Sequence, residues 1–122
     1  MRTTTEIMDQ YNRAFLEHDP ALLADLVAPD CVMESIQPAP DGTRYEGEAA
    51  NLKFWQDLAA DRDSWFDVEE TFVMGDRAII RWRFNFAGGS VRGVNLMRVQ
   101  NGRIVEALGY AKSPGQPAPL PE

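Results

Sequence analysis

The chain has 122 residues, 44% hydrophobic and 25% charged, which is typical of one soluble globular domain with its own core. Its single cysteine, Cys31, and single histidine, His18, exclude a disulfide framework and any multi-cysteine or histidine-rich metal site. A net charge of −7 argues against nucleic acid and anionic membrane as partners, and the lack of a long apolar run or signal peptide predicts a cytoplasmic protein.

The N-terminal segment predicts two helices. Apolar residues recur at near-helical spacing from Ile7 to Leu16, after a threonine-rich start. This helix should end at Asp19-Pro20, because a residue that precedes proline avoids the helical region. Asp19 can then cap a second, short helix over PALLADLV, with Pro20 in its first position.

The middle of the chain predicts a short strand, a loop and a third helix. The segment CVMESI carries β-branched residues near both ends, and QPAPDGTRYEG is a loop by its prolines and its Asp-Gly pair. The third helix covers EAANLKFWQDLAADR. Its apolar residues should share one side, namely Ala50, Phe54, Leu58 and either Ala49 or Leu52.

The second half of the chain predicts an antiparallel meander of four strands. Turn signals separate them, and Asn101-Gly102 is the strongest of these signals. The strands are SWFDVEETFVM, RAIIRWRFNF, VRGVNLMRVQ and RIVEALGYAK. The second strand alternates strictly, with Ala78, Ile80, Trp82, Phe84 and Phe86 on one face and Ile79, Arg81, Arg83 and Asn85 on the other.

Together these elements predict a single domain over residues 1–112, followed by a proline-rich tail, residues 113–122, that is disordered or loosely packed. Helices followed by strands indicate an α+β fold. We expect three N-terminal helices on one face of a curved, mainly antiparallel sheet, enclosing a cone-shaped, mostly apolar cavity. Such a cavity is a natural site for a small molecule.

The element order and three stretches, YNRAFLEHD, APDCVMES and GVNLMRVQNGRIVEALGY, resemble the NTF2-like superfamily with its cystatin-like fold. The SnoaL-like and ketosteroid-isomerase-like branch is the most similar. The resemblance implies cofactor-independent isomerisation, cyclisation or dehydration of a largely apolar carbonyl compound, such as a steroid-like or polyketide-like molecule, through an enolate. The superfamily also contains binding modules, so a non-catalytic module for a small ligand is the alternative.

The resemblance also implies site residues. The tyrosine of the isomerases corresponds to Tyr11, their catalytic aspartate to Ser35, and their second oxyanion-hole acid to Asn95. Tyr11 and Asn95 would then donate hydrogen bonds to the developing oxyanion. A serine cannot abstract a carbon-bound proton without an adjacent base, so proton transfer falls to Glu34, with Ser35 or a water as the substitute. Strand alternation points Glu34 and Ser35 to opposite faces unless the strand end bulges.

Other residues are expected to line the cavity. Trp55 occupies the place of a cavity-facing aromatic residue of the isomerases, and Gly109 is a small residue that would leave volume. Met33 and Met97 should contribute apolar wall. The epoxide-hydrolase branch of the superfamily needs acids where this chain has Asn85 and Gly109, so that activity is not expected, and neither a metal nor a cofactor is implied.

The arginine-bearing face of the second long strand has two interpretations. Arg81 and Arg83 can face solvent or a partner, or their guanidinium groups can bind a carboxylate or enolate in the cavity. The register from the Gly75-Asp76 turn favours the cavity, with Arg83 as a binding residue. Ile80, Trp82 and Phe84 would then face outward, and a homodimer through this face would cover them.

Overall fold

A capping box begins the first helix, α1 (Thr4–Leu16). The Thr3 hydroxyl accepts from the Glu6 N–H at 3.1 Å, and the Glu6 carboxylate accepts from the Thr3 N–H at 2.8 Å. The side chains that α1 buries are Ile7, Met8, Tyr11, Ala14 and Phe15. The predicted helix therefore forms, and Tyr11 lies on its buried side.

The computed structural model describes residues 1–112, and the predicted tail lies outside the described residues. After α1 come the 3-10 turn η1 (Pro20–Leu23), β1 (Val27–Glu34), β2 (Arg44–Glu46), α2 (Glu48–Ala60), β3 (Trp65–Met74), β4 (Arg77–Phe86), β5 (Gly89–Gln100) and β6 (Arg103–Ala111). The α+β class is confirmed. No helix of the described residues has both the length and the apolar character that crossing a membrane requires.

Residues 1–112 form two α-helices, so the expectation of three was wrong. Asp19 caps the second segment as predicted, accepting from the Ala21 N–H, but the segment is a single 3-10 turn. The chain has already joined the sheet at Leu26, whose carbonyl oxygen accepts from the Ile104 N–H at 2.7 Å. Pairing with β6 therefore stops the helix before a second turn can form.

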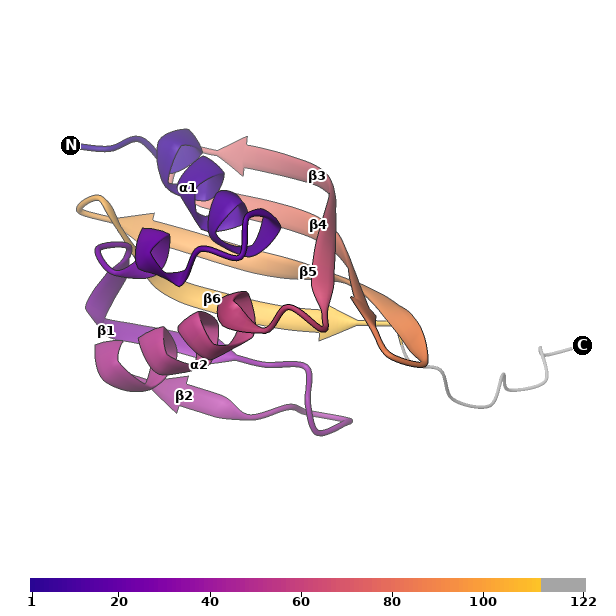
Figure 1. The fold of residues 1–122 in the computed structure, drawn as a ribbon. Coiled ribbons are helices and arrows are strands. Elements are labelled where there is room, and N and C mark those ends of the chain that lie inside the picture. The colour runs from indigo at the N-terminus through magenta and orange to yellow at the C-terminus, as the bar shows by residue number, and fades with distance from the viewer. Residues whose placement is uncertain (113–122) are drawn as a thin grey trace, which may run out of the picture.

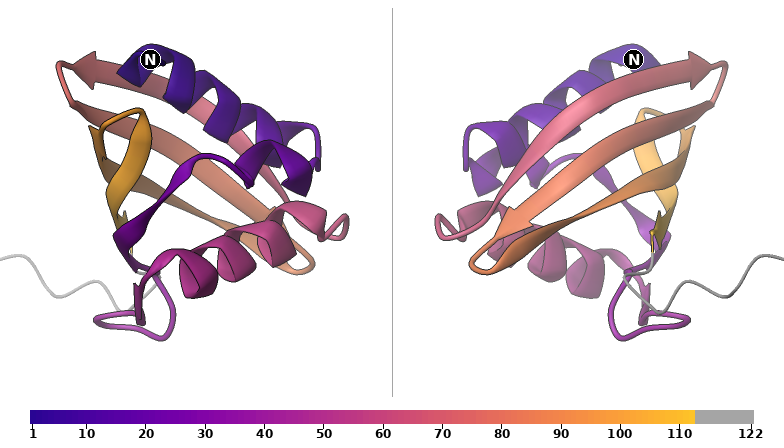
Figure 2. Two further views of the ribbon diagram at one scale, coloured as in Figure 1. Left: turned by 90° about the vertical axis from the view of Figure 1, so that its left-hand side faces the viewer. Right: turned by 90° about the vertical axis from the view of Figure 1, so that its right-hand side faces the viewer.

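The sheet has the strand order β2-β1-β6-β5-β4-β3 and is mixed, because β1 runs parallel to β6 while the other neighbours are antiparallel. The strand β1 begins at Val27, four residues before the expected start, and β2 forms within the predicted loop. The helix α1 packs against β3 and β4, and α2 packs against β1 (Figure 1). Figure 2 shows the sheet curving around the two helices.

The helix α2 buries a different side from the predicted one. Its buried residues are Asn51, Trp55 and Ala59, whereas Ala50 is exposed and Phe54 is half-buried. The Asn51 amide sets this rotation, because its nitrogen donates to the carbonyl oxygens of Cys31, Tyr45 and Gly47 at 3.0, 3.2 and 2.7 Å. The pattern of apolar residues alone could not show that a buried asparagine sets the rotation of this helix.

The strand β4 also presents the opposite face to the one expected. Ala78, Ile80 and Trp82 are buried under the helices, while Arg81 and Arg83 lie on the outer face. Burying a large apolar side chain stabilises a fold by about 1.5–3 kcal/mol, which outweighs the weak register preference of a two-residue turn. The apolar face of β4 is thus covered by the protein's own helices.

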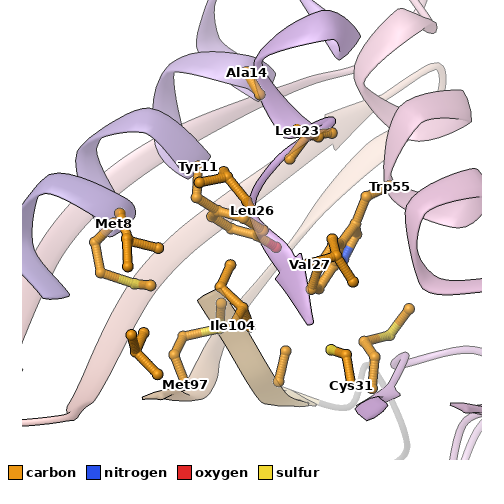
Figure 3. Close-up of a cluster of buried hydrophobic side chains, with 14 of the residues drawn as sticks. Met8, Tyr11, Ala14, Leu23, Leu26, Val27, Cys31, Trp55, Met97 and Ile104 are labelled. Carbon is orange, nitrogen blue, oxygen red and sulfur yellow. The ribbon is translucent and has the colours of Figure 1, made fainter. Parts of the chain in front are cut away.

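The core lies between the two helices and the sheet, with buried side chains from α1, α2, β1, β4, β5 and β6; Figure 3 shows part of it. Met97 belongs to this buried cluster together with Ile104 and Cys31. Burial raises the pKa of the Cys31 thiol to about 12, so the thiol stays protonated at neutral pH. Cys31 is a small core residue rather than a nucleophile.

Candidate functional site

A cavity of about 350 Å³ lies between the concave face of the sheet and the two helices. Most of its wall is apolar or aromatic, with side chains from α1, α2, β3, β4 and β5. Tyr11 and Trp55 reach into this region from α1 and α2, and their rings meet edge to face with centroids 5.2 Å apart (Figure 3). Large apolar cavities with few polar groups are the usual form of small-molecule sites.

Three polar side chains of the wall, Trp82, Asn95 and Tyr11, form a chain of hydrogen bonds. The Trp82 indole N–H donates to Asn95 Oδ1 at 3.1 Å, and Asn95 Nδ2 donates to the Tyr11 hydroxyl oxygen at 3.4 Å. Tyr11 is 5% exposed, and burial raises the pKa of its hydroxyl, which therefore stays neutral across the physiological range. The structure thus brings together the two residues expected to act as donors, although they are 84 positions apart in the chain.

Glu34 is placed differently from the expectation. Its carbonyl oxygen lies at the cavity wall, 3.0 Å from where a Cβ on Gly109 would stand, but its carboxylate bonds to Arg44 at 3.4 Å. Glu34 pairs with Leu108 across the sheet, and by alternation both side chains lie on the outer face, opposite Met33 and its partner Ala107. The strand end does not bulge inward, so the expected position of this carboxylate inside the cavity is wrong.

Ser35 lines the cavity at the position of the isomerase aspartate, but its hydroxyl is occupied by the following loop. It donates to the Gln37 carbonyl oxygen at 2.9 Å and accepts from the Thr43 N–H at 3.2 Å. These bonds close the loop between β1 and β2. Gly42 completes the closure, because its φ is +76° and a Cβ there would overlap the Ser35 carbonyl oxygen.

The other predicted binding residues divide into two groups. Met33, Trp55 and Gly109 line the cavity as expected. Arg83 does not, because β4 turns its apolar face inward, and its guanidinium instead donates to the Ser90 hydroxyl at 3.0 Å. Met97 is also excluded from the wall, since it lies in the core.

Sequence reasoning missed Trp82 as a site residue. The strict alternation of β4 placed it with Phe84 but could not say which face was inside. Phe66, on the neighbouring strand, packs edge-on against Trp82 with centroids 5.7 Å apart and also lines the cavity. A tryptophan among smaller apolar residues on one strand face is a signal for a large buried surface, although not for a hydrogen-bond donor.

The chemistry available to the cavity is that of neutral donors in an apolar surrounding. Among residues 1–112, no cluster of three or more His, Cys, Asp or Glu side chains is arranged to hold a metal ion. Of the described residues that line the cavity, Glu34 is the only Asp, Glu, Lys, Arg or His, and its carboxylate bonds to Arg44. The site can therefore polarise an oxygen atom by hydrogen bonding.

Comparison with known proteins supports this architecture. None of the curated proteins matches the chain. Among solved structures, an NTF2-like protein of unknown function from Mesorhizobium loti has 57% identity and a TM-score of 0.87, with coverage of 90% of this chain and 91% of that one. A candidate polyketide cyclase from Sinorhizobium meliloti has 26% identity, a TM-score of 0.69 and coverage of 85% and 93%.

A candidate ketosteroid isomerase from Kribbella flavida shares the fold, with 21% identity, a TM-score of 0.80 and coverage of 95% and 82%. The model of the SnoaL-like domain family matches residues 8–107. This span includes every strand of the described fold except the end of β6. The chain therefore belongs to the SnoaL-like domain family, within the NTF2-like fold.

Proposed function

We propose that this protein binds a small, mainly apolar carbonyl compound in its cavity and holds the carbonyl oxygen at Tyr11. The observation that carries the proposal is the hydrogen-bonded Tyr11–Asn95 pair, set in a wall that is mostly apolar and aromatic. A neutral ligand fits this wall, because a buried charge without a partner is strongly unfavourable. Ligands of the steroid-like or polyketide-like class have this character.

Direct titration tests the proposal. The probe is fluorenone, a flat, fused-ring ketone, and the wild-type protein should bind it with a dissociation constant on the order of tens of micromolar, at ~0.4 kcal/mol per heavy atom. Leu58→Trp, which adds an indole to the cavity wall, should lower the affinity roughly tenfold or more. Leu16→Trp places the same substitution on the exposed side of α1 and is the matched control.

If fluorenone does not bind to the wild type, or if both tryptophan variants bind it equally well, the cavity is not the ligand site. Intrinsic fluorescence provides the measurement, because Trp55 and Trp82 stand in the wall. Calorimetry on the same samples gives an independent dissociation constant.

Isomerisation, cyclisation or dehydration through an enolate is the second candidate function. The Tyr11 hydroxyl favours it, because a donor in a dry site stabilises a developing oxyanion far better than one in water. The carboxylate of Glu34 lies outside the cavity and the Ser35 hydroxyl is bonded to the loop, so water is the remaining base. Binding without catalysis is therefore the better supported function.

Glu34→Gln separates these two candidates. We expect fluorenone affinity within about twofold of the wild type, because the carboxylate faces Arg44 and an exposed ion pair contributes about 0–1 kcal/mol. Arg44 keeps its shorter contact with Glu46, at 2.7 Å. If a substrate is found and Glu34→Gln abolishes its turnover, the carboxylate must enter the cavity during the reaction, and the enzymatic function gains support.

The protein is also expected to form a homodimer through the outer face of the sheet. A row of apolar side chains crosses four paired strands there: Phe72, Ile79, Leu96 and Leu108. Phe72 and Leu96 are 44% and 39% exposed. A twofold axis would bring two such rows together. These residues replace Trp82 and Phe84, which the sequence suggested as the interface.

Sedimentation at micromolar concentration should give twice the chain mass of 13.7 kDa for the wild type. Leu96→Glu, which places a charge in the middle of the row, should sediment as a monomer. Fluorenone binding should be retained in this variant because Leu96 does not line the cavity. A monomeric wild type would refute the dimer.

A further inference from the structure

We propose that Trp82 determines the ligand preference of the cavity. By donating to Asn95 Oδ1, its indole N–H turns the amide nitrogen toward Tyr11, so this polar pair presents the Tyr11 hydroxyl proton to a ligand oxygen. The site then selects a ketone over the alcohol with the same carbon skeleton. This inference rests on the proposed function, and it assigns Trp82 as a positioning residue that acts through Asn95 and Tyr11.

The direction of the hydrogen-bond chain follows from the chemistry of its first member. An indole N–H can donate but cannot accept, so the end of the Asn95 amide that faces Trp82 must be the oxygen. The nitrogen end then faces Tyr11, where it donates to the hydroxyl oxygen. A smaller apolar residue in place of Trp82 would leave the amide free to adopt either orientation.

The hydroxyl proton of Tyr11 is thereby directed away from Asn95. Because the hydroxyl oxygen accepts from Asn95 Nδ2, its own hydrogen needs another acceptor. Within residues 1–112, the Tyr11 hydroxyl takes part in this one hydrogen bond, as an acceptor. The remaining direction is the cavity, whose wall includes Tyr11. A ligand oxygen placed there would receive the hydrogen bond.

The sequence of β5 holds Trp82 in place. Its partner across the sheet is Gly93, and a Cβ at this position would stand 2.6 Å from Cη2 of the indole. The ring therefore lies over a strand position that must have no side chain. Phe66, from the neighbouring strand β3, packs edge-on against the indole, at 89°. Both contacts fix the indole so that its N–H reaches Asn95.

This arrangement distinguishes two oxidation states of one ligand. A ketone oxygen accepts from Tyr11 and has no hydrogen of its own to satisfy. An alcohol also accepts, but its hydroxyl hydrogen then finds no acceptor at the Tyr11–Asn95 pair, since Asn95 Oδ1 already accepts from Trp82 and is turned away from Tyr11. A buried donor without a partner is costly enough to lower affinity roughly tenfold.

The test uses three probes with the same ring system, which are fluorenone, fluorenol and the hydrocarbon fluorene. Calorimetric titration of the wild type should show fluorenone binding roughly tenfold more tightly than fluorenol. In Trp82→Phe the ratio should fall to within about twofold, because Asn95 can turn its oxygen toward the ligand or toward Tyr11. Fluorene has no oxygen, so its affinity should fall only by the small factor that corresponds to the lost apolar contact with the indole.

Two further measurements separate this effect from a loss of packing. Phe54→Leu removes a ring of the cavity wall that packs against Tyr45 and takes no part in the hydrogen-bond chain, so it should weaken all three probes in parallel and keep the ketone-to-alcohol ratio. The infrared carbonyl stretch of bound fluorenone should lie at lower frequency in the wild type than in Trp82→Phe. If Trp82→Phe does not fold, benzothienylalanine at position 82 retains the shape and removes only the N–H.

The outcomes are distinguishable. If none of the three probes binds to the wild type, the proposed function is wrong and this inference falls with it. If all three bind but the wild type shows no ketone preference, the cavity binds apolar ligands and the inference about polarity is wrong. If the preference exists and survives the loss of the Trp82 N–H, another group sets the polarity of the site.

Discussion

Replacement of Tyr11 by phenylalanine should weaken the binding of fluorenone about 10- to 100-fold while leaving the protein folded. The variant removes the hydroxyl that would bond to the ligand oxygen, and it also leaves Asn95 Nδ2 without its acceptor. The ligand oxygen would then be buried without its donor, which costs about 1–3 kcal/mol. A factor of ten in the dissociation constant corresponds to about 1.4 kcal/mol. The ring of Tyr11, which packs against Phe15 and Trp55, is retained.

Fluorene provides the internal control for this variant. It has no oxygen, so its affinity for Tyr11→Phe and wild type should agree within about threefold. Asn95→Leu should reproduce the selective loss of fluorenone binding, because it removes the amide that orients the hydroxyl. For an enzyme that stabilises an oxyanion, turnover would fall by roughly 10²–10³ in the same variants. Wild-type binding by both variants would show that neither residue contacts the ligand.

The largest effect on stability is expected for Asn51→Ala, at about 3 kcal/mol. The side chain is completely buried, and its nitrogen donates to three carbonyl oxygens that belong to β1, β2 and the start of α2. Alanine would leave the Tyr45 carbonyl without this donor and open a small void. A buried hydrogen-bond network of this kind is one of the few causes of a large single-site loss.

Chemical denaturation followed by circular dichroism measures this loss, and the thermal midpoint should fall by roughly 10 °C. Lys53→Ala is the matched control on the same helix. Its ion pair with Asp57, at 2.9 Å, is exposed, so its removal should change the free energy of unfolding by less than about 0.5 kcal/mol. Equal stability of the two variants would show that Asn51 does not anchor α2.

Asn51 and Tyr11 both influence the geometry of the cavity, from different helices. Asn51 fixes the rotation of α2, and one turn further along the helix Trp55 enters the cavity wall. Tyr11 enters the same wall from α1. The position of the binding group therefore depends on buried polar contacts outside the cavity as well as on the residues that line it.

Elements with a strong periodic pattern could be predicted from the amino-acid sequence alone. The helix at Ile7–Leu16 and the four long strands follow from periods of 3.6 and 2, because these periods are set by local backbone geometry. The resemblance to the NTF2-like superfamily pointed to Tyr11 and Asn95, which the structure places within hydrogen-bond distance. The periodic patterns are local in the sequence, and the resemblance rests on the spacing between residues along the chain.

Which face of each element is buried depends on how the elements pack against one another in three dimensions. Alternation in β4 defines two faces equally well, and burial of Ile80 and Trp82 on the side that α1 covers selects one of them, which moves Arg83 to the outside. The direction of Glu34 and the hydrogen bond from Trp82 to Asn95 depend on the same choice. The face on which a side chain lies depends on the free energy of packing between segments that are distant in the sequence. A local pattern carries no information about this free energy.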